Sequence, residues 1–338
     1  MADAKPIALI GTGSWGTALS ILLGGKGRRV MLYARRQEMA DALTADRENC
    51  LYLPGVRLPD TIEVVTDLGA VLADAPCVVL AVPTVGMRET VRRMAPLLRD
   101  EQLLVITAKG LEVDTGCRMS EVVAQELGGH CADRVVALSG PNLAREVALG
   151  IASTSVAASG DAAAAGRAQE LFMTPRFRVY TNPDLIGVEL GGALKHVIAI
   201  GAGVSDGLGF GDNTKAALVT RGLAEITRLG VAMGAQAATF RGLAGVGDLM
   251  ATCATTASRN HRVGYELAQG RSLDQILAGM NQMIAEGIPT TRAVHSLSRQ
   301  IGVEMPIADV VHDLLFAGRS PQAAVEELMQ RAGRSELE

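Results

Sequence analysis

The first half of the chain alternates short apolar runs with segments of helical or loop character. The apolar runs lie at residues 7–10, 29–33, 77–82, 103–108, 135–139, 151–158 and 177–180. A helical segment at 17–23 follows the first run, and an Ala/Gly-rich turn and helix start at 157–166 joins the last two. This order predicts an α/β fold of the Rossmann type, with helices around a doubly wound, mainly parallel sheet.

The pattern changes after Asn182-Pro-Asp184, where helical runs replace the strand-like ones. The expected helices lie at 218–229, 263–269, 273–278, 294–299 and 323–331. The chain therefore divides into a dinucleotide-binding Rossmann-type domain at 1–184 and an all-α, substrate-binding domain at 185–338. Two glycine-rich segments, 201–211 and 242–248, are apolar and poor in Ser and Pro, which favours packed loops over linkers.

Composition supports this picture and narrows the class of protein. A length of 338 residues favours two domains, and 38 Gly with five Phe and one Trp indicate an aliphatic core with many glycine turns. A net charge of -4 gives no support for nucleic-acid binding. The five cysteines contain no Cys-x-x-Cys pair, which fits reduced thiols and indicates neither a disulfide nor a metal site.

The amino terminus has no apolar signal region. No uninterrupted apolar run reaches the roughly 18 residues that a membrane span needs. We therefore expect a soluble, cytoplasmic protein with no stable membrane insertion.

A glycine-rich turn, Gly11-Thr-Gly13-Ser-Trp-Gly16, directly follows the first apolar run. Between a strand and a helix, Gly11 permits the tight turn, Gly13 lets the backbone approach a pyrophosphate, and Gly16 lets the helix pack on the strand. Helix-terminal N–H groups then face the phosphates. We interpret the turn as a dinucleotide site in preference to a purely structural glycine turn.

The end of the second apolar run should meet the adenosine ribose of such a ligand. Sites that prefer NAD usually place Asp or Glu there, but this chain has Ala34-Arg35-Arg36. Two guanidinium groups suit a 2′-phosphate, so we predict that NADP is preferred and that NAD is also used. The alternative is a solvated basic turn.

Later apolar runs end in residues that suit ligand binding. Lys109-Gly110 follows the run at 103–108, and Gly140-Pro-Asn142 follows the run at 135–139. Ligands of an open parallel sheet bind outside the carboxyl ends of its strands. Lys109 is therefore placed to meet cofactor or substrate, with an ordinary surface lysine as the alternative.

Lys195 lies in an apolar and glycine-rich stretch, 187–203, where a charge is poorly solvated. Burial lowers the pKa of a lysine, and a lysine with a pKa nearer neutrality is a competent general acid or base at a carbonyl or carbinol. The alternative is a stem that lies along the helix with its head in water.

Asp248, Thr252 and Ser258-Arg-Asn260 lie within a dozen residues of one another. If the segment is helical, Asp248 and Thr252 share a face. The guanidinium of Arg259, with hydroxyl and amide groups beside it, can hold a phosphate. These residues suit a small hydroxylated phosphate ester, although Arg259 and Arg262 could equally form a solvated helix face.

These blocks resemble the bacterial NAD(P)-dependent glycerol-3-phosphate dehydrogenases from end to end. The matching blocks are Gly11-x-Gly-x-x-Gly-Thr-Ala18, Ala108-Lys-Gly-Leu111, Leu138-Ser-Gly-Pro141, Asn182-Pro-Asp-x-x-Gly-Val-Glu-Leu-Gly-Gly-Ala-Leu-Lys195, Asp206-Gly-Leu-Gly-Phe-Gly-Asp-Asn213, Thr220-Arg-Gly-Leu-Ala-Glu225, Gly245-x-Gly-Asp-Leu249 and Ser258-Arg-Asn260. The resemblance implies reversible oxidation of sn-glycerol 3-phosphate to dihydroxyacetone phosphate, which supplies glycerol 3-phosphate for phospholipid synthesis. We also expect a homodimer, although the sequence itself does not fix the oligomeric state.

The resemblance further implies roles for single residues. Lys195 would be the proton donor or acceptor, with Lys109 and Asp248 beside the reacting end of the substrate. The other substrate-binding residues would be Gly140, Asn142, Thr252, Ser258, Arg259 and Asn260. The cofactor would lie against the glycine turn and against Ser14, Trp15, Arg35, Arg36, Lys109, Ala144, Arg259, Ile284 and Glu286.

The chain departs from the family pattern at two positions in the site. After Ser-Gly-Pro the family commonly has Ser or Thr and then an aromatic residue, where this chain has Asn142-Leu143. After the catalytic lysine the family commonly has Asn, where this chain has His196. Asn142 keeps a polar side chain, whereas His196 is either an auxiliary donor or a histidine that packs the helix.

Two rival interpretations remain at this point. A reductase of the same architecture that acts on a β-hydroxy acid would not need Ser258-Arg-Asn260 as a phosphate anchor. A non-catalytic NADP-binding sensor would need only the first domain, so the presence of Lys109, Lys195 and Asp248 together argues against it.

Overall fold

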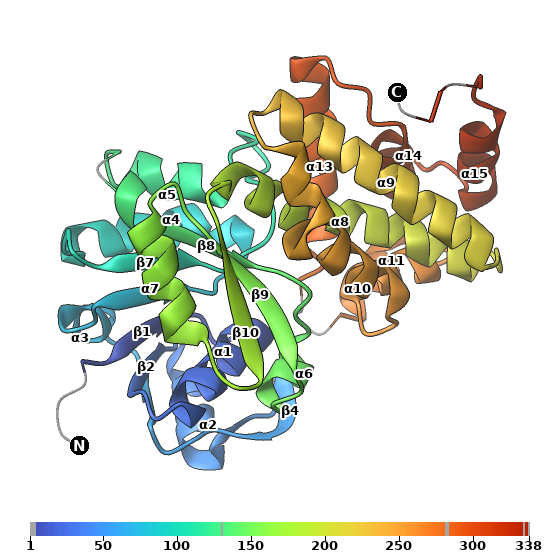
Figure 1. Ribbon diagram of the computed structural model, residues 1–338. Helices are drawn as coiled ribbons and strands as arrows, with labels where there is room; N and C mark the ends of the chain where they lie inside the picture. The colour runs from blue at the N-terminus through green and yellow to red at the C-terminus, as the bar shows by residue number, and fades with distance from the viewer. Residues whose placement is uncertain (1–4, 130, 281–283, 334, 337–338) are drawn as a thin grey trace.

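The computed structural model describes residues 5–129, 131–280, 284–333 and 335–336. An eight-stranded sheet flanked by helices forms the N-terminal part, and a cluster of helices forms the C-terminal part (Figure 1). The α/β class and the all-α C-terminal domain predicted from the sequence are thereby confirmed.

The sheet has the order β10-β9-β8-β7-β6-β1-β2-β5. Neighbouring strands run parallel except for β8 and β9, which run antiparallel. The strands are β1 (Ile7–Ile10), β2 (Val30–Tyr33), β5 (Ile62–Val65), β6 (Cys77–Leu80), β7 (Leu103–Ile106), β8 (Val135–Ser139), β9 (Ser153–Ala158) and β10 (Phe177–Asn182). A separate hairpin, β3 (Glu48–Asn49) and β4 (Leu53–Arg57), follows α2.

Helices cover both faces of the sheet because successive strand residues point to opposite sides. Ile7 and Leu9 of β1 pack in the cluster that contains α1 and α7 residues, whereas Ala8 and Ile10 pack in the cluster that contains α3, α4 and α5 residues. The helices of this domain are α1 (Ser14–Gly25), α2 (Gln37–Asp46), α3 (Leu68–Ala73), α4 (Met87–Met94), α5 (Met119–Glu126), α6 (Ala144–Ala148) and α7 (Ala162–Phe172).

The helical domain is built around α8 (Leu185–Gly207), which packs against α9, α10, α11, α13 and α14. The carboxylate of Asp184 begins this helix by accepting a hydrogen bond from the Gly187 amide at 2.9 Å, which satisfies one of the free N–H groups of the first turn. The other helices are α9 (Asp212–Ala232), α10 (Asp248–Ala254), α11 (Arg259–Ala268), α12 (Leu273–Ala278), α13 (Gly287–Ile301), α14 (Pro306–Phe316) and α15 (Pro321–Gln330).

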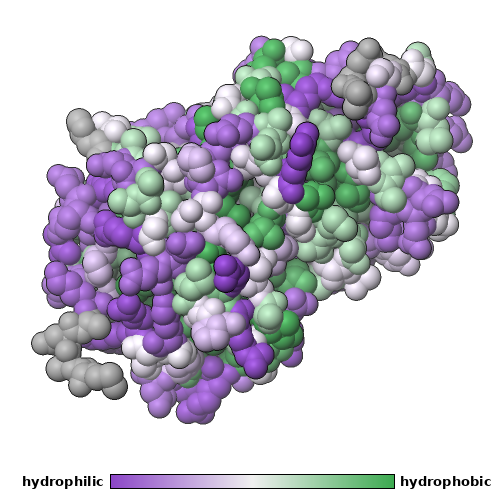
Figure 2. Space-filling model, in the orientation of Figure 1, coloured by the Kyte–Doolittle hydropathy of each residue, from purple (hydrophilic) through white to green (hydrophobic). Residues whose placement is uncertain are grey.

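Among the described residues, α8 alone is long and apolar enough to cross a membrane by length and composition. Of its most apolar window, 78% is buried inside the structure, as in the core helix of a globular domain. Figure 2 shows how hydropathy is distributed over one face of the surface. This face of the N-terminal part is largely hydrophilic, and hydrophobic residues are more frequent toward the helical domain.

The prediction of packed loops at 201–211 and 242–248 is wrong for most of these residues. Residues 201–207 form the last turns of α8, and residues 243–247 form a single π-helical turn before α10. A Cβ atom on Gly203 would lie 1.9 Å from the carbonyl oxygen of His261, and one on Gly264 would lie 1.9 Å from that of Ile200. These glycines therefore serve backbone contact between α8 and α11.

Candidate active site

The glycine turn between β1 and α1 has the shape that a pyrophosphate requires. Gly11 has a φ of +122°, and a Cβ atom there would lie 2.5 Å from the carbonyl oxygen of Ala81. A Cβ atom on Gly13 would meet nothing within 4 Å, and no side chain caps the helix at this residue. The first amides of α1 are therefore free to meet an anion from an open side.

The small hairpin β3–β4 braces this turn. Asn49 donates from Nδ2 to the carbonyl oxygen of Thr12 at 2.9 Å and to Oγ1 of Thr17 at 2.7 Å. Ser14 donates its hydroxyl proton to the carbonyl oxygen of Tyr52 at 2.6 Å. The hairpin thus fixes both sides of the turn, a role that the sequence pattern did not reveal.

Trp15 and Ala144 lie near each other, because both pack against the cluster formed by Ala18, Leu53 and Val56. Arg35 and Arg36 follow the end of β2, and both side chains are exposed. Neither forms an ion pair within the described part of the chain. Two unpaired guanidinium groups at this strand end fit a 2′-phosphate.

Asp248 is the centre of a compact charged cluster. Lys195 Nζ lies 2.5 Å from Asp248 Oδ1 and 2.8 Å from Thr252 Oγ1. Lys109 Nζ lies 2.8 Å from Asp248 Oδ2 and 2.9 Å from the carbonyl oxygen of Gly140. The fold therefore brings together residues from the carboxyl ends of β7 and β8 with residues from α8 and α10.

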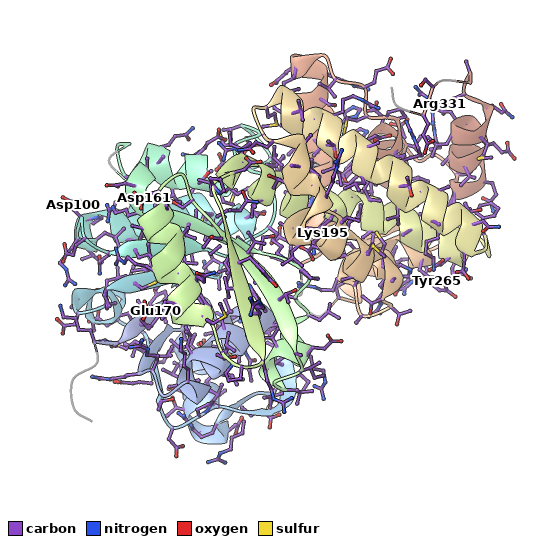
Figure 3. All side chains as sticks on the ribbon, viewed as in Figure 1. Asp100, Asp161, Glu170, Lys195, Tyr265 and Arg331 are labelled. Atoms are coloured by element: carbon purple, nitrogen blue, oxygen red, sulfur yellow. The ribbon has the colours of Figure 1, made fainter. Side chains whose placement is uncertain are left out.

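Lys195 is 5% exposed and points from α8 into this cluster, on the side of the helical domain that faces the sheet (Figure 3). Burial lowers its pKa from the usual value to about 8, the Asp248 carboxylate opposes that change, and the Lys109 ammonium adds to it. An amine with this pKa can hold or release a proton near neutral pH.

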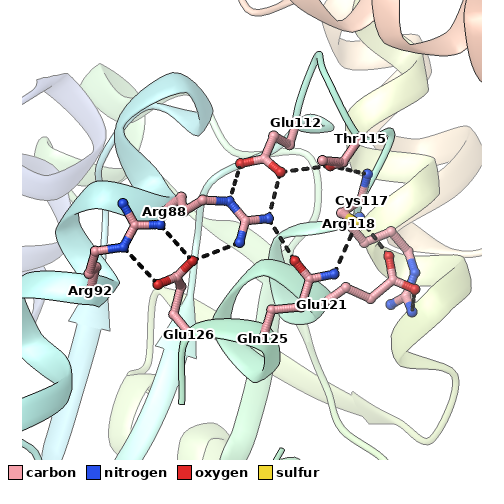
Figure 4. A network of polar contacts seen from close by, with 9 residues as sticks. All are labelled: Arg88, Arg92, Glu112, Thr115, Cys117, Arg118, Glu121, Gln125 and Glu126. Atoms are coloured by element: carbon pink, nitrogen blue, oxygen red, sulfur yellow. Dashed lines mark hydrogen bonds and ion pairs between the residues drawn. The ribbon is translucent and has the colours of Figure 1, made fainter. Parts of the chain in front are cut away.

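The loop that carries Lys109 is anchored by a polar network on the surface. Arg88 of α4 forms ion pairs with Glu112 at 2.6 Å and with Glu126 of α5 at 2.7 Å, and Arg92 adds a contact to Glu126 at 3.0 Å (Figure 4). These contacts join the middle of the segment between β7 and α5 to α4 and to the last residue of α5.

A second tie connects α5 to α8 inside the protein. Glu189, two turns before Lys195, accepts hydrogen bonds from Arg118 Nη1 at 2.6 Å and from the Ser120 amide at 2.8 Å. Burial raises the pKa of the Glu189 carboxyl, and the Arg118 guanidinium opposes that rise. Nothing in the sequence pattern linked these two residues.

Ser258, Arg259 and Asn260 form the start of α11. Ser258 caps the helix by accepting a hydrogen bond from the His261 amide at 3.3 Å. Arg259 is exposed, whereas Asn260 is buried. The amides of this first turn, with the guanidinium beside them, are suited to an anion such as phosphate.

Asn142 is held by β9. Its Nδ2 donates to the carbonyl oxygen of Thr154 at 2.8 Å, and its Oδ1 accepts from Ser155 Oγ at 3.1 Å. One N–H of the Asn142 side chain is therefore left to donate a hydrogen bond to a ligand.

Glu286, at the start of α13, contacts the sheet domain from the helical domain. Its carboxylate accepts a hydrogen bond from Thr84 Oγ1 at 2.7 Å, just after β6, and the guanidinium of Arg259 is close enough to influence its charge. Ile284 is partly exposed two residues before it. Thr84 was not predicted, although its place after a parallel strand is where ligands of such sheets bind.

Within the described ranges, no group of three or more His, Cys, Asp or Glu residues could hold a metal ion. The groups available for chemistry are thus the Lys195 amine and the Asp248 carboxylate, in a fold whose glycine turn suits a dinucleotide. This combination of fold and site defines the class of dinucleotide-dependent dehydrogenases.

The family follows from two sequence models that match consecutive parts of the chain. The model of the NAD-dependent glycerol-3-phosphate dehydrogenase N-terminus matches residues 6–165, and that of the C-terminus matches residues 184–326. The chain belongs to the NAD-dependent glycerol-3-phosphate dehydrogenase family, as its sequence motifs predicted.

Individual proteins agree with this assignment. The glycerol-3-phosphate dehydrogenase [NAD(P)+] of Chlorobium limicola is 50% identical over 98% of this chain and 99% of its own length. That of Geobacillus kaustophilus is 50% identical over 98% of this chain and 96% of its own length. The crystal structure of the enzyme from Coxiella burnetii superposes with a TM-score of 0.92 at 39% identity, covering 97% of this chain and 99% of that one.

Proposed function

We propose that this protein is a glycerol-3-phosphate dehydrogenase that uses NADP or NAD to interconvert sn-glycerol 3-phosphate and dihydroxyacetone phosphate. The observation that carries the proposal is the buried Lys195, whose ammonium group contacts Asp248 and whose pKa is lowered to about 8 by burial. A lysine in this state suits proton transfer at a secondary alcohol or ketone.

In the oxidation direction, Lys195 in its neutral form takes the proton of the C2 hydroxyl group. A nicotinamide dinucleotide held by the glycine turn would supply the acceptor for the hydride of the same carbon, and loss of the proton and the hydride together converts the alcohol to a ketone. In the reverse direction, the Lys195 ammonium returns the proton to the oxygen. Asp248 stabilises that ammonium through the contact at 2.5 Å.

Lys109 plays a second electrostatic role in this proposal. Its ammonium group contacts the other carboxylate oxygen of Asp248 at 2.8 Å and lies beside the same reacting centre. A positive charge there stabilises negative charge that develops on the substrate oxygen. It also keeps Asp248 oriented toward Lys195.

The phosphate of the substrate is proposed to bind at the start of α11. Amides of the first helical turn, the guanidinium of Arg259 and the Ser258 hydroxyl supply donors there. Asn260, Thr252, Gly140 and Asn142 complete the proposed substrate site.

The cofactor is proposed to lie along the glycine turn, with its pyrophosphate at Gly13 and the start of α1. Arg35 and Arg36 favour the 2′-phosphate of NADP. Further contacts are proposed for Ser14, Trp15, Lys109, Ala144, Arg259, Ile284 and Glu286.

We take residues 1–184 as the dinucleotide-binding domain and 185–338 as the substrate-binding domain. The last strand ends at Asn182 and α8 begins at Leu185, which supports a boundary between them. We further propose a cytoplasmic homodimer without stable membrane insertion, which supplies glycerol 3-phosphate for phospholipid synthesis.

The test is the decay of nicotinamide absorbance on addition of dihydroxyacetone phosphate, measured separately with NADPH and NADH. We expect turnover with both, and more efficient turnover with NADPH. A panel of β-keto acids separates the rival reductase, which would reduce these and leave the phosphate ester unchanged. Cofactor binding without turnover of any of these compounds would favour a sensor instead.

A further inference from the structure

His196 occupies a position next to the proposed proton-transfer residue, where it is held in one orientation by its neighbours. It follows Lys195 on α8, where the residue is partly exposed and its neighbours Lys195 and Val197 are buried. Asn260, the second residue of α11, lies with its Nδ2 atom 2.8 Å from His196 Nδ1.

The tautomer of this histidine follows from a chain of two hydrogen bonds that joins Gly287, Asn260 and His196. The Gly287 amide is always a donor, and it donates to Asn260 Oδ1 at 2.9 Å. The amide group of Asn260 is therefore oriented with Nδ2 toward the ring, and His196 Nδ1 must be the acceptor. The ring proton is then on Nε2.

A positively charged His196 does not fit this arrangement. With a proton on Nδ1, the ring N–H would face the N–H of Asn260, and two donors would lie in contact. If the Asn260 amide were flipped to avoid this, its NH₂ group would face the Gly287 N–H, which is again a contact of two donors. Burial holds the pKa of His196 well below its usual value, and the cations of Lys195, Lys109 and Arg259 lower it further.

The Nε2–H group is the unused donor of this network. It has no hydrogen-bond partner among the residues that the structure describes. Adjacent residues on a helix point about 100° apart, so His196 and Lys195 reach different parts of one ligand. Lys195 turns to Asp248 and Thr252, whereas His196 turns to the start of α11, where the phosphate is proposed to bind.

We propose that His196 binds substrate, donating its Nε2–H to a phosphate oxygen of the ester. This inference rests on the proposed function, because it assumes that the ester's phosphate occupies the start of α11. The family commonly has Asn at this position, so His196 gives this chain a donor farther from the helix. As an uncharged group, it adds a hydrogen bond without adding a fourth cation to the site.

Three substitutions separate the two ring nitrogens. His196→Leu removes both functions, His196→Asn keeps an acceptor near the place of Nδ1, and His196→Gln keeps an N–H donor near the place of Nε2. Hydrogen bonds to charged groups are strong enough that the Leu and Asn variants should raise the KM for dihydroxyacetone phosphate about tenfold to a hundredfold. We expect the Gln variant to recover most of that loss.

Unphosphorylated dihydroxyacetone at high concentration is the matched control. Its kcat/KM, measured with each variant, should change by less than about threefold, because the lost partner is the phosphate. The Kd for NADPH and the thermal midpoint should also stay near the wild-type values, which shows that folding and cofactor binding are intact.

The outcomes are distinct. Leu and Asn variants with an unchanged KM would overturn the proposal and make His196 a packing residue. A loss in the Leu variant that Asn restores and Gln does not would assign the effect to the Asn260 contact and would also overturn it. Failure of the wild-type protein to turn over the ester would instead refute the proposed function itself.

Discussion

Arg118 and Glu189 form a buried ion pair that joins the start of α5 to the second turn of α8, with a distance of 2.6 Å between Nη1 and Oε2. Glu189 also receives the amide and the hydroxyl of Ser120 at 2.8 Å and 2.6 Å. The Glu189 carboxylate, through three hydrogen-bond donors of Arg118 and Ser120, thus ties the N-terminal part of the fold to the helix that carries Lys195.

We therefore expect Glu189→Gln to destabilise the protein by about 3 kcal/mol, because breaking a buried ion pair leaves the remaining charge poorly compensated. Urea denaturation measures the change. Glu63→Gln is the control, since Glu63 and its partner Arg29 are more than half exposed. That variant should change the unfolding free energy by less than about 1 kcal/mol. Equal effects in the two variants would contradict the role given to Glu189.

Replacing Lys195 by Ala should abolish most turnover while NADPH still binds. Loss of a general acid or base typically lowers the rate about 10²- to 10⁴-fold. Steady-state kinetics measure the first effect, and fluorescence titration with NADPH measures the second. Lys215→Ala is a suitable control, because Lys215 pairs with Asp206 and not with Asp248. Near wild-type turnover without Lys195 would remove it from the mechanism.

The two reaction directions should depend on pH in opposite ways. Because burial lowers the pKa of Lys195 to about 8, its ammonium form is present below that pH and its neutral form above it. Reduction of dihydroxyacetone phosphate uses the ammonium form, so its kcat should fall as the pH rises through about 8. Oxidation of glycerol 3-phosphate uses the neutral amine, so its kcat should rise over the same range.

Asp248→Asn refines this test. The carboxylate raises the pKa of Lys195, so its removal should move the inflection to lower pH wherever residual activity can be measured. Two profiles that are both flat between about pH 7 and 9 would be inconsistent with proton transfer by Lys195.

Arg259→Ala should weaken substrate binding by roughly 1.5 to 3 kcal/mol, because a charge-assisted hydrogen bond to phosphate is lost. The KM for dihydroxyacetone phosphate measures this change. Arg262→Ala serves as the control: that side chain is 52% exposed and pairs with Glu266 on the same helix. Unphosphorylated dihydroxyacetone should be a very poor substrate of the wild-type enzyme, and efficient turnover of it would argue against the phosphate anchor.

Arg35→Ala combined with Arg36→Ala should raise the KM for NADPH far more than that for NADH. Both side chains are exposed, so solvent screening limits their contribution to about 1 to 3 kcal/mol. Raised salt should narrow the wild-type preference for the same reason. Arg29→Ala, at the opposite end of β2, is the matched control. Equal use of both cofactors before and after the double substitution would identify a solvated basic turn.

Sequence patterns predicted the parts of the fold that are determined by interactions between residues close together in the chain. The Gly11 turn and α12 (Leu273–Ala278) lie where the sequence places them. Strand β5 (Ile62–Val65) was missed because a four-residue edge strand is formed by its pairing with β2 more than by its own composition. The antiparallel direction of β9 is likewise a property of the connection before it.

Contacts between distant residues explain the rest of what the sequence did not reveal. Thr84 and Glu286 are 202 positions apart, and His196 and Asn260 are 64 apart. Each pair consists of common polar residues, and the role of each residue becomes apparent only when its partner in the fold is known. Gly203 and Gly207 were interpreted as loop residues for the same reason, because only the position of α11 shows why they lack side chains.

The backbone contact of α8 with α11 at Gly203 and Gly264 has a consequence for the choice of substrate. Lys195 lies on the first of these helices, and the proposed phosphate anchor begins the second. Because no side chain separates the two helices there, a change of rotamer cannot alter their spacing. The backbone therefore fixes the distance from the proposed phosphate site to Lys195. We expect an ester one carbon longer than glycerol 3-phosphate to place its reacting carbon out of reach of the lysine.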